Sequence, residues 1–215
     1  MANSINIGVA TLDDEQYRLD NPTVCEIASR NKLEYCLRHN YSLHLVKHSL
    51  VDDRPTVWSK IPLISNLLNL HDWIFWADQD CLFMNFNIRL EDIIDPAYEM
   101  VITQDMYGLS AGNFFIKKGD WAKELFERAW REVEQCRDHW GQEQLAMELT
   151  LQNFPHLNAK VKYVPQNQIC SYHNVELTEE YRSYMTGDFI VHFPSHYGKP
   201  TLPEFMQSFS QEVIL

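Results

Sequence analysis

Two aspartates, Asp78 and Asp80, stand near the end of the apolar run DWIFWADQDCLF, with a single residue between them. Alternate side chains of a strand point to the same face, so these carboxylates can converge on one point. Carboxylates this close repel each other unless a cation or hydrogen bonds offset their charge. Their oxygens favour a hard divalent ion, Mn²⁺ or Mg²⁺, over zinc. The spacing alone is equally compatible with an acidic turn that ends a core strand.

A second group of candidate residues lies near the C-terminus, in the segment DFIVHFPSHYGKP. His192 ends an apolar run there and is a candidate third metal ligand, although a single histidine in such a run is more often a packed core residue. Gly198 and Lys199 follow, and a glycine beside a lysine suits the oxygens of a diphosphate. An ordinary solvated side chain is the alternative interpretation of Lys199.

The elements that would position these residues alternate between strand and helix patterns. We expect a strand at 5–12 and a helix at 22–40, with Asn21 as its cap and Pro22 in its first turn. Further strands are predicted at 41–48, 73–78, 100–105, 110–119 and 160–166, with a last one that begins at 188 and runs into a loop. Further helices are predicted at 56–72, 120–136 and 141–155, the second of them capped by Asp120.

This alternation predicts an α/β/α sandwich with a mostly parallel central sheet. Open sheets of this class bind ligands at the carboxyl ends of their strands, where Asp78 and Asp80 would emerge. A chain of 215 residues is long enough for one substantial core and short for two, so a single domain over residues 1–215 is expected.

The charge and the cysteines narrow the classes of function. A formal net charge of -12 argues against a nucleic-acid partner, because phosphate backbones are bound by basic surfaces. An acidic protein that binds phosphates needs a cation between them. Five scattered cysteines without a C-x-x-C pair predict neither a disulfide framework nor a zinc site. Reduced thiols, no signal peptide and no long apolar run predict a soluble, cytoplasmic protein without a membrane span.

With these residues in view, the chain resembles the metal-dependent GT-A glycosyltransferases, which have a Rossmann-like fold and a nucleotide-sugar donor. The stretch WSKIPLISNLLNLHDWIFWADQDCLFMN is similar to the core of glycosyltransferase family 34, and VHFPSHYGKP to the ending of the glycogenin-like family 8. The likeness extends more loosely over residues 5–200. It also includes transferase domains of large algal viruses, which would place the protein in a host cytoplasm if its source is viral.

The resemblance implies that residues 1–105 bind the nucleotide and that residues 106–215 bind the sugar and the acceptor. It makes Asp78, Asp80 and His192 the ligands of Mn²⁺ or Mg²⁺. Thr11 and Leu12 would border the base, with Tyr17 stacking on it. The residues implied at the nucleotide and its phosphates are Thr11, Leu12, Tyr17, Lys60, Asp78, Gly198 and Lys199.

The residues implied at the sugar come mainly from two shorter segments. LSAG stands where the family usually has Leu-Asn-Thr-Gly, so Ser110 replaces an asparagine and Gly112 matches the glycine. GQEQ matches an acid-glutamine pair near the transferred sugar, and Asp105 is a further acid at the end of a strand. Sugar contacts are thus implied for Asp105, Ser110, Gly112 and Gln144, and catalytic roles for Asp105, Glu143 and Gln144.

The function implied is transfer of a hexose-type sugar from a UDP-sugar, or less favourably a GDP-sugar, to a carbohydrate acceptor with retention of configuration.

Two alternative functions stay open. A haloacid-dehalogenase-type phosphatase would use Asp78 as nucleophile and Asp80 as acid/base, but Cys81-Leu82 stand where Gly-Thr should follow. A non-catalytic carbohydrate-binding domain would need exposed aromatic residues, whereas the tryptophans predicted to pack in the core are Trp73, Trp76, Trp121 and Trp130.

Overall fold

A computed structural model of the chain describes residues 5–173, 182–194 and 199–215. The strands of its larger sheet are β1 Ile7–Leu12, β2 Ser42–Val46, β3 Trp73–Ala77, β5 Met100–Asp105, β6 Gly108–Lys117 and β7 Val161–Val164. They lie in the order β2-β1-β3-β6-β5-β7. Within this sheet β6 runs antiparallel to both of its neighbours and the remaining strands run parallel, as expected for a mostly parallel sheet.

A smaller sheet lies beside the larger one. Its strands are β4 Cys81–Phe83, β8 Ser171–Tyr172 and β9 Ile190–His192, in the order β4-β9-β8. The chain therefore leaves the large sheet at the end of β3 and enters the small sheet after three intervening residues, which places Asp78 and Asp80 at the junction. Of these strands the sequence predicts only β9, as the strand that begins at residue 188, because runs as short as β4 and β8 show no periodicity.

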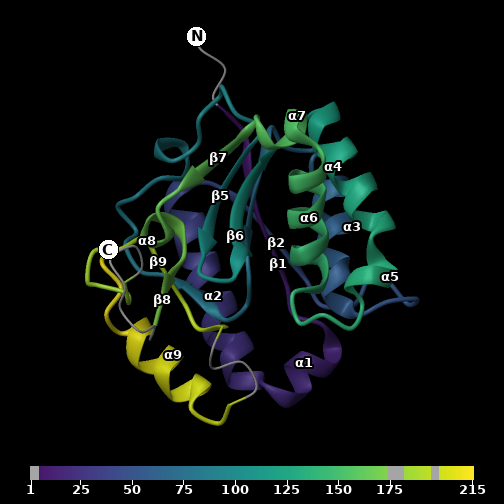
Figure 1. Cartoon of the computed structure of the whole chain (residues 1–215). Helices are drawn as coiled ribbons and strands as arrows, with labels where there is room; N and C mark the ends of the chain where they lie inside the picture. The colour runs from purple at the N-terminus through teal and green to yellow at the C-terminus, as the bar shows by residue number, and fades with distance from the viewer. Residues whose placement is uncertain (1–4, 174–181, 195–198) are drawn as a thin grey trace.

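The helices are α1 Glu15–Asp20, α2 Pro22–His39, α3 Lys60–Leu67, α4 Asp120–Arg131, α5 Val133–Cys136, α6 Gln142–Asn153, α7 Pro155–Asn158, α8 Gln166–Ile169 and α9 Leu202–Ser210. Two 3₁₀ turns are η1 Thr56–Ser59 and η2 Leu90–Asp92. Helices α3, α4 and α6 cover one face of the large sheet, while α2 and the small sheet cover the other (Figure 1). Helix α9 packs beside α2 against the small sheet.

Successive side chains of β3 point to opposite faces of the sheet, and both faces are covered. Ile74 and Trp76 pack into the core beneath α3, α4 and α6, whereas Trp73, Phe75 and Ala77 pack into the core on the opposite face. All five residues are buried, as expected for a strand covered on both faces. The strand is thus held rigidly from both sides up to the residue that precedes Asp78.

Several helix predictions need correction. Asp120 does not cap α4: the capping position belongs to Gly119, and the Asp120 carboxylate accepts a hydrogen bond from Lys123 Nζ at 3.0 Å. The predicted helix 120–136 is interrupted after Arg131, and the predicted helix 56–72 begins as a 3₁₀ turn and ends at Leu67. Helix α1 has no buried residue and therefore no apolar periodicity that could predict it.

The packing predictions for the tryptophans and cysteines agree with the structure. Trp73 and Trp76 are buried, and Trp121 and Trp130 pack half-buried against the same core as Trp76. The five cysteines are free thiols and are buried: Cys25, Cys36, Cys81, Cys136 and Cys170. Across the described ranges, every helix is too short or too polar to span a bilayer.

Candidate active site

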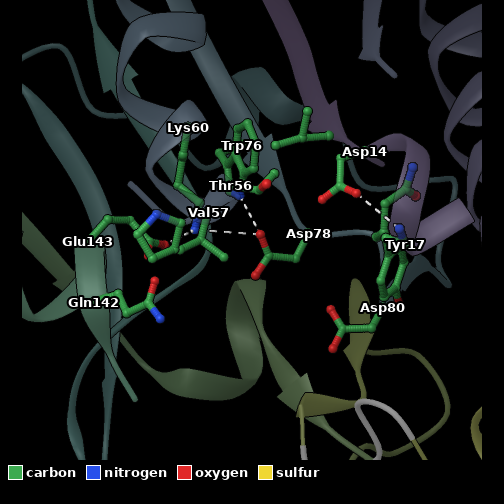
Figure 2. Close-up of a pocket in the computed structure, with 13 residues that line it drawn as sticks. Asp14, Tyr17, Thr56, Val57, Lys60, Trp76, Asp78, Asp80, Gln142 and Glu143 are labelled. Carbon is green, nitrogen blue, oxygen red and sulfur yellow. Dashed lines mark hydrogen bonds and ion pairs between the residues drawn. The ribbon is translucent and has the colours of Figure 1, made fainter. Parts of the chain in front are cut away.

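A pocket of about 360 Å³ opens at the carboxyl ends of β1 and β3. Its wall combines the end of β1, the start of α1, the turn η1, the segment after β3 and the first residues of α6 (Figure 2). This is the position at which open α/β sheets bind ligands. The lining residues are Leu12, Asp14, Tyr17, Pro55, Thr56, Val57, Lys60, Trp76, Asp78, Gln79, Asp80, Gln142 and Glu143.

Asp78, Asp80 and His192 converge beside this pocket, with one potential ligand atom from each within 4.8 Å of the others. His192 reaches the aspartates because β9 pairs with β4, where His192 lies opposite Cys81. The amide of Phe193 also donates to the Asp80 carbonyl at 2.9 Å. The small sheet therefore brings the third residue of the cluster to two aspartates that are separated by one residue in the sequence.

Charge compensation inside the cluster is visible between Asp80 and His192. His192 Nε2 lies 3.1 Å from Asp80 Oδ1, and both side chains are buried. Burial opposes the charged form of each group, but the pairing outweighs it: the pKa of Asp80 lies below its ordinary value and that of His192 well above. Two carboxylates and an imidazole offer oxygen and nitrogen donors that suit Mn²⁺ or Mg²⁺, so the residues fit the predicted ion.

The Asp78 carboxylate is oriented by groups from two directions. The indole Nε1 of Trp76 donates to Asp78 Oδ1 at 2.6 Å, and Lys60 Nζ lies 3.6 Å from the same oxygen (Figure 2). The backbone amide of Asp78 donates to the Gly112 carbonyl at 2.9 Å. Trp76 precedes Asp78 by two positions, so the strand places both side chains on one face.

The His192 ring is held by a glycine and a thiol. A Cβ atom built on Gly112 would lie 2.4 Å from His192 Cε1, so only glycine leaves room for the imidazole. The Cys170 Sγ lies 3.2 Å from His192 Nδ1, on the opposite side of the ring from the Nε2 that meets Asp80. With Nδ1–H bonded to the sulfur, Nε2 is the ring nitrogen that would ligate a metal, in place of the proton that it shares with Asp80. Gly112, expected at the sugar, thus contacts the proposed metal ligand.

A buried ion pair borders the other side of Asp78. Lys60 Nζ donates to Glu143 Oε1 at 2.8 Å and to the Ala111 carbonyl at 3.0 Å. Burial lowers the pKa of Lys60, but Asp78 and Glu143 raise it above its ordinary value, so the ammonium stays charged. Burial raises the pKa of Glu143, and Lys60 opposes that shift without cancelling it. Gln144 does not line the pocket, and its Oε1 accepts from the Ala111 amide at 2.8 Å.

Asp105 and Ser110 lie beyond the cluster and are linked to it by Tyr172. The Tyr172 hydroxyl donates to Asp105 Oδ2 and lies 3.1 Å from Ser110 Oγ. Its ring stands 5.7 Å from the His192 ring, centroid to centroid. Burial and the Asp105 charge raise the pKa of Tyr172, which keeps the hydroxyl protonated as a donor. Neither Asp105 nor Ser110 lines the pocket itself.

The remaining predicted residues separate into two groups. Leu12 and Tyr17 line the pocket, whereas the neighbouring Thr11 is fully buried and does not. Lys199 is exposed and is not part of the pocket wall, and Gly198 lies outside the described residues. The structure thus brings Leu12, Tyr17, Lys60, Asp78, Asp80 and Glu143 together at the pocket, with His192 directly behind them.

Sequence reasoning missed several residues of this site. The sequence predicts Trp76 only as a core residue. Its position two residues before Asp78 nevertheless indicates that the two side chains share one face of the strand, where they are hydrogen-bonded. Gln79 stands between the two aspartates and lines the pocket, as does Gln142 next to the GQEQ acid. Cys170 and Tyr172 give no signal in the sequence, because the chain distance of 20 or more residues to His192 hides their contact.

Comparison with known families adds one decisive observation. The profile of the galactosyl transferase GMA12/MNN10 family, glycosyltransferase family 34, matches residues 6–98 and 95–195. The chain belongs to this family. The matched residues include both aspartates and His192, and the prediction of a family 34 protein is confirmed. The proposed similarity of residues 191–200 to family 8 falls partly outside the described residues.

Curated proteins similar to this chain are distant relatives. An uncharacterised alpha-1,2-galactosyltransferase of Schizosaccharomyces pombe is 25% identical over 219 residues, covering 80% of this chain and 56% of the relative. The probable alpha-1,6-mannosyltransferase MNN10 of Saccharomyces cerevisiae is 26% identical over 183 residues, covering 66% of this chain and 46% of that protein. The chain thus spans about half the length of these two relatives.

Solved structures share the fold. A glycosyltransferase involved in glycosylation of the major capsid of PBCV-1 superposes with a TM-score of 0.73 at 16% identity, covering 94% of this chain and 99% of that one. The galactosyltransferase LgtC, solved with donor and acceptor sugar analogues, gives a TM-score of 0.61 at 11% identity, covering 97% and 96%. This family 34 chain therefore has the predicted GT-A fold.

Proposed function

We propose that the protein is a metal-dependent glycosyltransferase that moves a hexose-type sugar from a UDP-sugar to a carbohydrate acceptor, with retention of configuration. The observation that carries the proposal is the convergence of Asp78, Asp80 and His192 beside the pocket, in a chain that belongs to family 34. The names of these relatives describe a galactosyltransferase and a mannosyltransferase, so galactose and mannose are the first donor sugars to test.

Asp78, Asp80 and His192 would hold the ion, Mn²⁺ or Mg²⁺, and when bound it would supply positive charge for the diphosphate leaving group. The buried ammonium of Lys60 adds a second positive charge at Asp78 and lines the same pocket. Together these groups explain how a protein with a net charge of -12 can bind a nucleotide diphosphate. We keep Gly198 and Lys199 as phosphate contacts on the strength of the sequence motif alone.

The two ends of the pocket suggest how the donor lies. Leu12, Asp14 and Tyr17 form one end, where an aromatic ring and an apolar side chain suit a base. Gln142 and Glu143 form the other end, with Asp78 between the two ends in Figure 2. We assign the nucleoside to the Tyr17 end and the transferred sugar to the Glu143 end. The other residues predicted at the sugar do not line the pocket and would then support this sugar position from outside its wall: Asp105, Ser110 and Gln144.

The division at residue 105 is proposed as a division of tasks within a single domain. Residues before 105 supply Tyr17, Lys60, Asp78 and Asp80, and residues after it supply Glu143 and the third ligand, His192. Both parts contribute strands to the same sheet. Of the alternatives, the phosphatase is disfavoured by the family match. The non-catalytic carbohydrate-binding domain is distinguished by the measurement of turnover below.

The test is a thermal-shift screen of UDP- and GDP-sugars with and without Mn²⁺, followed by an assay of donor hydrolysis. A ligand that binds the native state raises its melting temperature, so we expect a Mn²⁺-dependent shift with a UDP-sugar. Asp78→Asn and Asp80→Asn should abolish both the shift and the hydrolysis, whereas Asp92→Asn, in the distant turn η2, should change neither. Undiminished hydrolysis in both site variants would refute the metal site, and binding without turnover would favour the non-catalytic domain.

A further inference from the structure

Two glutamine side chains in the pocket have polar atoms without partners. Gln79 is 5% exposed, and both its Nε2 and its Oε1 are buried without a hydrogen bond among the described residues. The Oε1 of Gln142 is buried and unpartnered in the same way. Both residues line the pocket. Buried amide groups are nearly always hydrogen-bonded in folded proteins, so two exceptions at one pocket require an explanation.

The backbone of Gln142 provides an independent observation. Its φ of 37° lies in the left-handed region, which non-glycine residues seldom adopt. The other described non-glycine residue with a positive φ, Asn40, ends helix α2, where that conformation is common. Gln142 instead begins helix α6 and precedes Glu143. Backbone strain of this kind concentrates at ligand-binding and catalytic positions.

The places of the two residues suggest different parts of one ligand. Gln79 lies between Asp78 and Asp80, the residues proposed to hold the metal at the diphosphate. Gln142 lies beside Glu143, on the opposite side of Asp78 from Asp14 and Tyr17 (Figure 2). An amide offers both a donor and an acceptor, which matches the hydroxyl and carbonyl groups of nucleosides and sugars.

We propose that Gln79 and Gln142 are donor-binding residues, Gln79 for the nucleoside diphosphate and Gln142 for the transferred sugar. The unpaired amide groups gain their hydrogen bonds when the donor binds. This inference rests on the proposed function, since it presumes a nucleotide sugar in the pocket. It goes further by naming two residues of this chain and the part of the donor that each contacts.

The experiment uses Gln79→Met and Gln142→Met, which keep side-chain length and remove the amide. Affinities for UDP and for UDP-galactose are measured by calorimetry in Mn²⁺, and melting temperatures without ligand. Gln79→Met should weaken both ligands by roughly tenfold, the effect of about one lost hydrogen bond. Gln142→Met should weaken UDP-galactose by a similar factor and leave UDP within twofold of the wild type.

The melting temperatures of the variants distinguish a binding role of the two glutamines from a structural role. Removing an unpaired buried amide removes an unsatisfied polar group, so both variants should melt at or above the wild-type temperature. Gln166→Met is the matched control, because Gln166 is a buried glutamine outside the pocket whose Oε1 is also unpartnered but whose Nε2 donates to the Cys170 carbonyl. It should melt lower and bind UDP normally.

Three outcomes decide the question. Weaker binding together with unchanged or raised melting temperatures supports the inference. Unchanged affinities in both variants, or lower melting temperatures without a loss of affinity, would overturn it while the proposed function stands. A wild-type protein that binds neither UDP nor UDP-galactose would instead refute the proposed function, so the two failures are distinguishable.

Discussion

The indole Nε1 of Trp76 lies 2.6 Å from Oδ1 of Asp78 and donates a hydrogen bond to it. The same tryptophan packs into the core beneath α3, and its ring faces Lys60 Nζ at 5.1 Å. Trp76 therefore ties the orientation of one proposed metal ligand to the packing of the hydrophobic core. Groups that hydrogen-bond to metal ligands commonly set how well those ligands bind the metal.

Trp76→Phe should weaken Mn²⁺ binding roughly tenfold, because phenylalanine fills most of the same space but cannot hold Asp78 Oδ1. The dissociation constant can be measured by electron paramagnetic resonance, without any turnover. Trp58→Phe is the matched control, since Trp58 is also fully buried in that core and its Nε1 has no partner among the described residues. Equal Mn²⁺ affinities in the two variants would contradict a role for the indole.

Gly112→Ala should weaken Mn²⁺ binding by roughly tenfold or more, because the added methyl group would lie 2.4 Å from His192 Cε1 and displace the ring. Gly119→Ala is a suitable control, since its nearest contact would be an ordinary 3.7 Å from Glu99 Oε2. If Gly112→Ala binds Mn²⁺ as tightly as Gly119→Ala does, His192 is not a ligand. Melting curves of both variants establish that the fold is retained.

Lys60→Met should destabilise the protein by about 3–5 kcal/mol, because it leaves the Glu143 carboxylate buried without its ion-pair partner. Lys60→Met/Glu143→Gln should recover part of this loss, since the second change removes the uncompensated charge. Urea unfolding of the two single variants and the double variant gives the coupling energy. Additive effects of the two changes would show that the ion pair contributes nothing to stability.

His44, in β2, and His71, just before β3, form a pair that should make the fold sensitive to acid. Their Nε2 atoms are 2.8 Å apart, so one imidazole must donate to a neutral partner. Burial lowers the pKa of both histidines below the ordinary value. The unfolded chain therefore takes up protons first as the pH falls, and the free energy of unfolding should decrease from about pH 7 towards pH 5.

His71→Gln removes the part of this proton uptake that belongs to His71 and should make the loss of stability between pH 7 and pH 5 shallower than in the wild type. His48→Gln, which changes an exposed histidine, serves as the control and should keep the wild-type slope. Urea unfolding at a series of pH values measures both. A wild-type slope in His71→Gln would mean that the pair does not govern the acid response.

The sequence predicts the large sheet and the proximity of Asp78 and Asp80, because strand periodicity and spacing are local properties. It also identifies His192 as a ligand candidate, although 112 residues separate it from Asp80. That contact depends on the pairing of β9 with β4, and β4 is a strand of three residues that periodicity does not reveal.

Other features of the site lie beyond local pattern for the same reason. Tyr172 joins Asp105 and Ser110 across more than 60 residues, and Cys170 reaches His192 only after β8 and β9 pair. The role expected of Gly112 differs from its position for a steric reason, because no sequence pattern shows that an imidazole ring packs against its Cα. Lys60 is predicted at the phosphates, and the structure adds its pairing with Glu143.

The position of β6 has a consequence for any attempt to divide the protein. This strand follows residue 105 in the chain, yet it lies between β3 and β5 and pairs with both. A fragment that ended at residue 105 would leave these two strands with unpaired backbone groups along their apolar lengths. Exposed edges of this kind promote aggregation. The part proposed to bind the nucleotide should therefore aggregate when it is produced alone, and a split version would need both pieces to assemble as they fold.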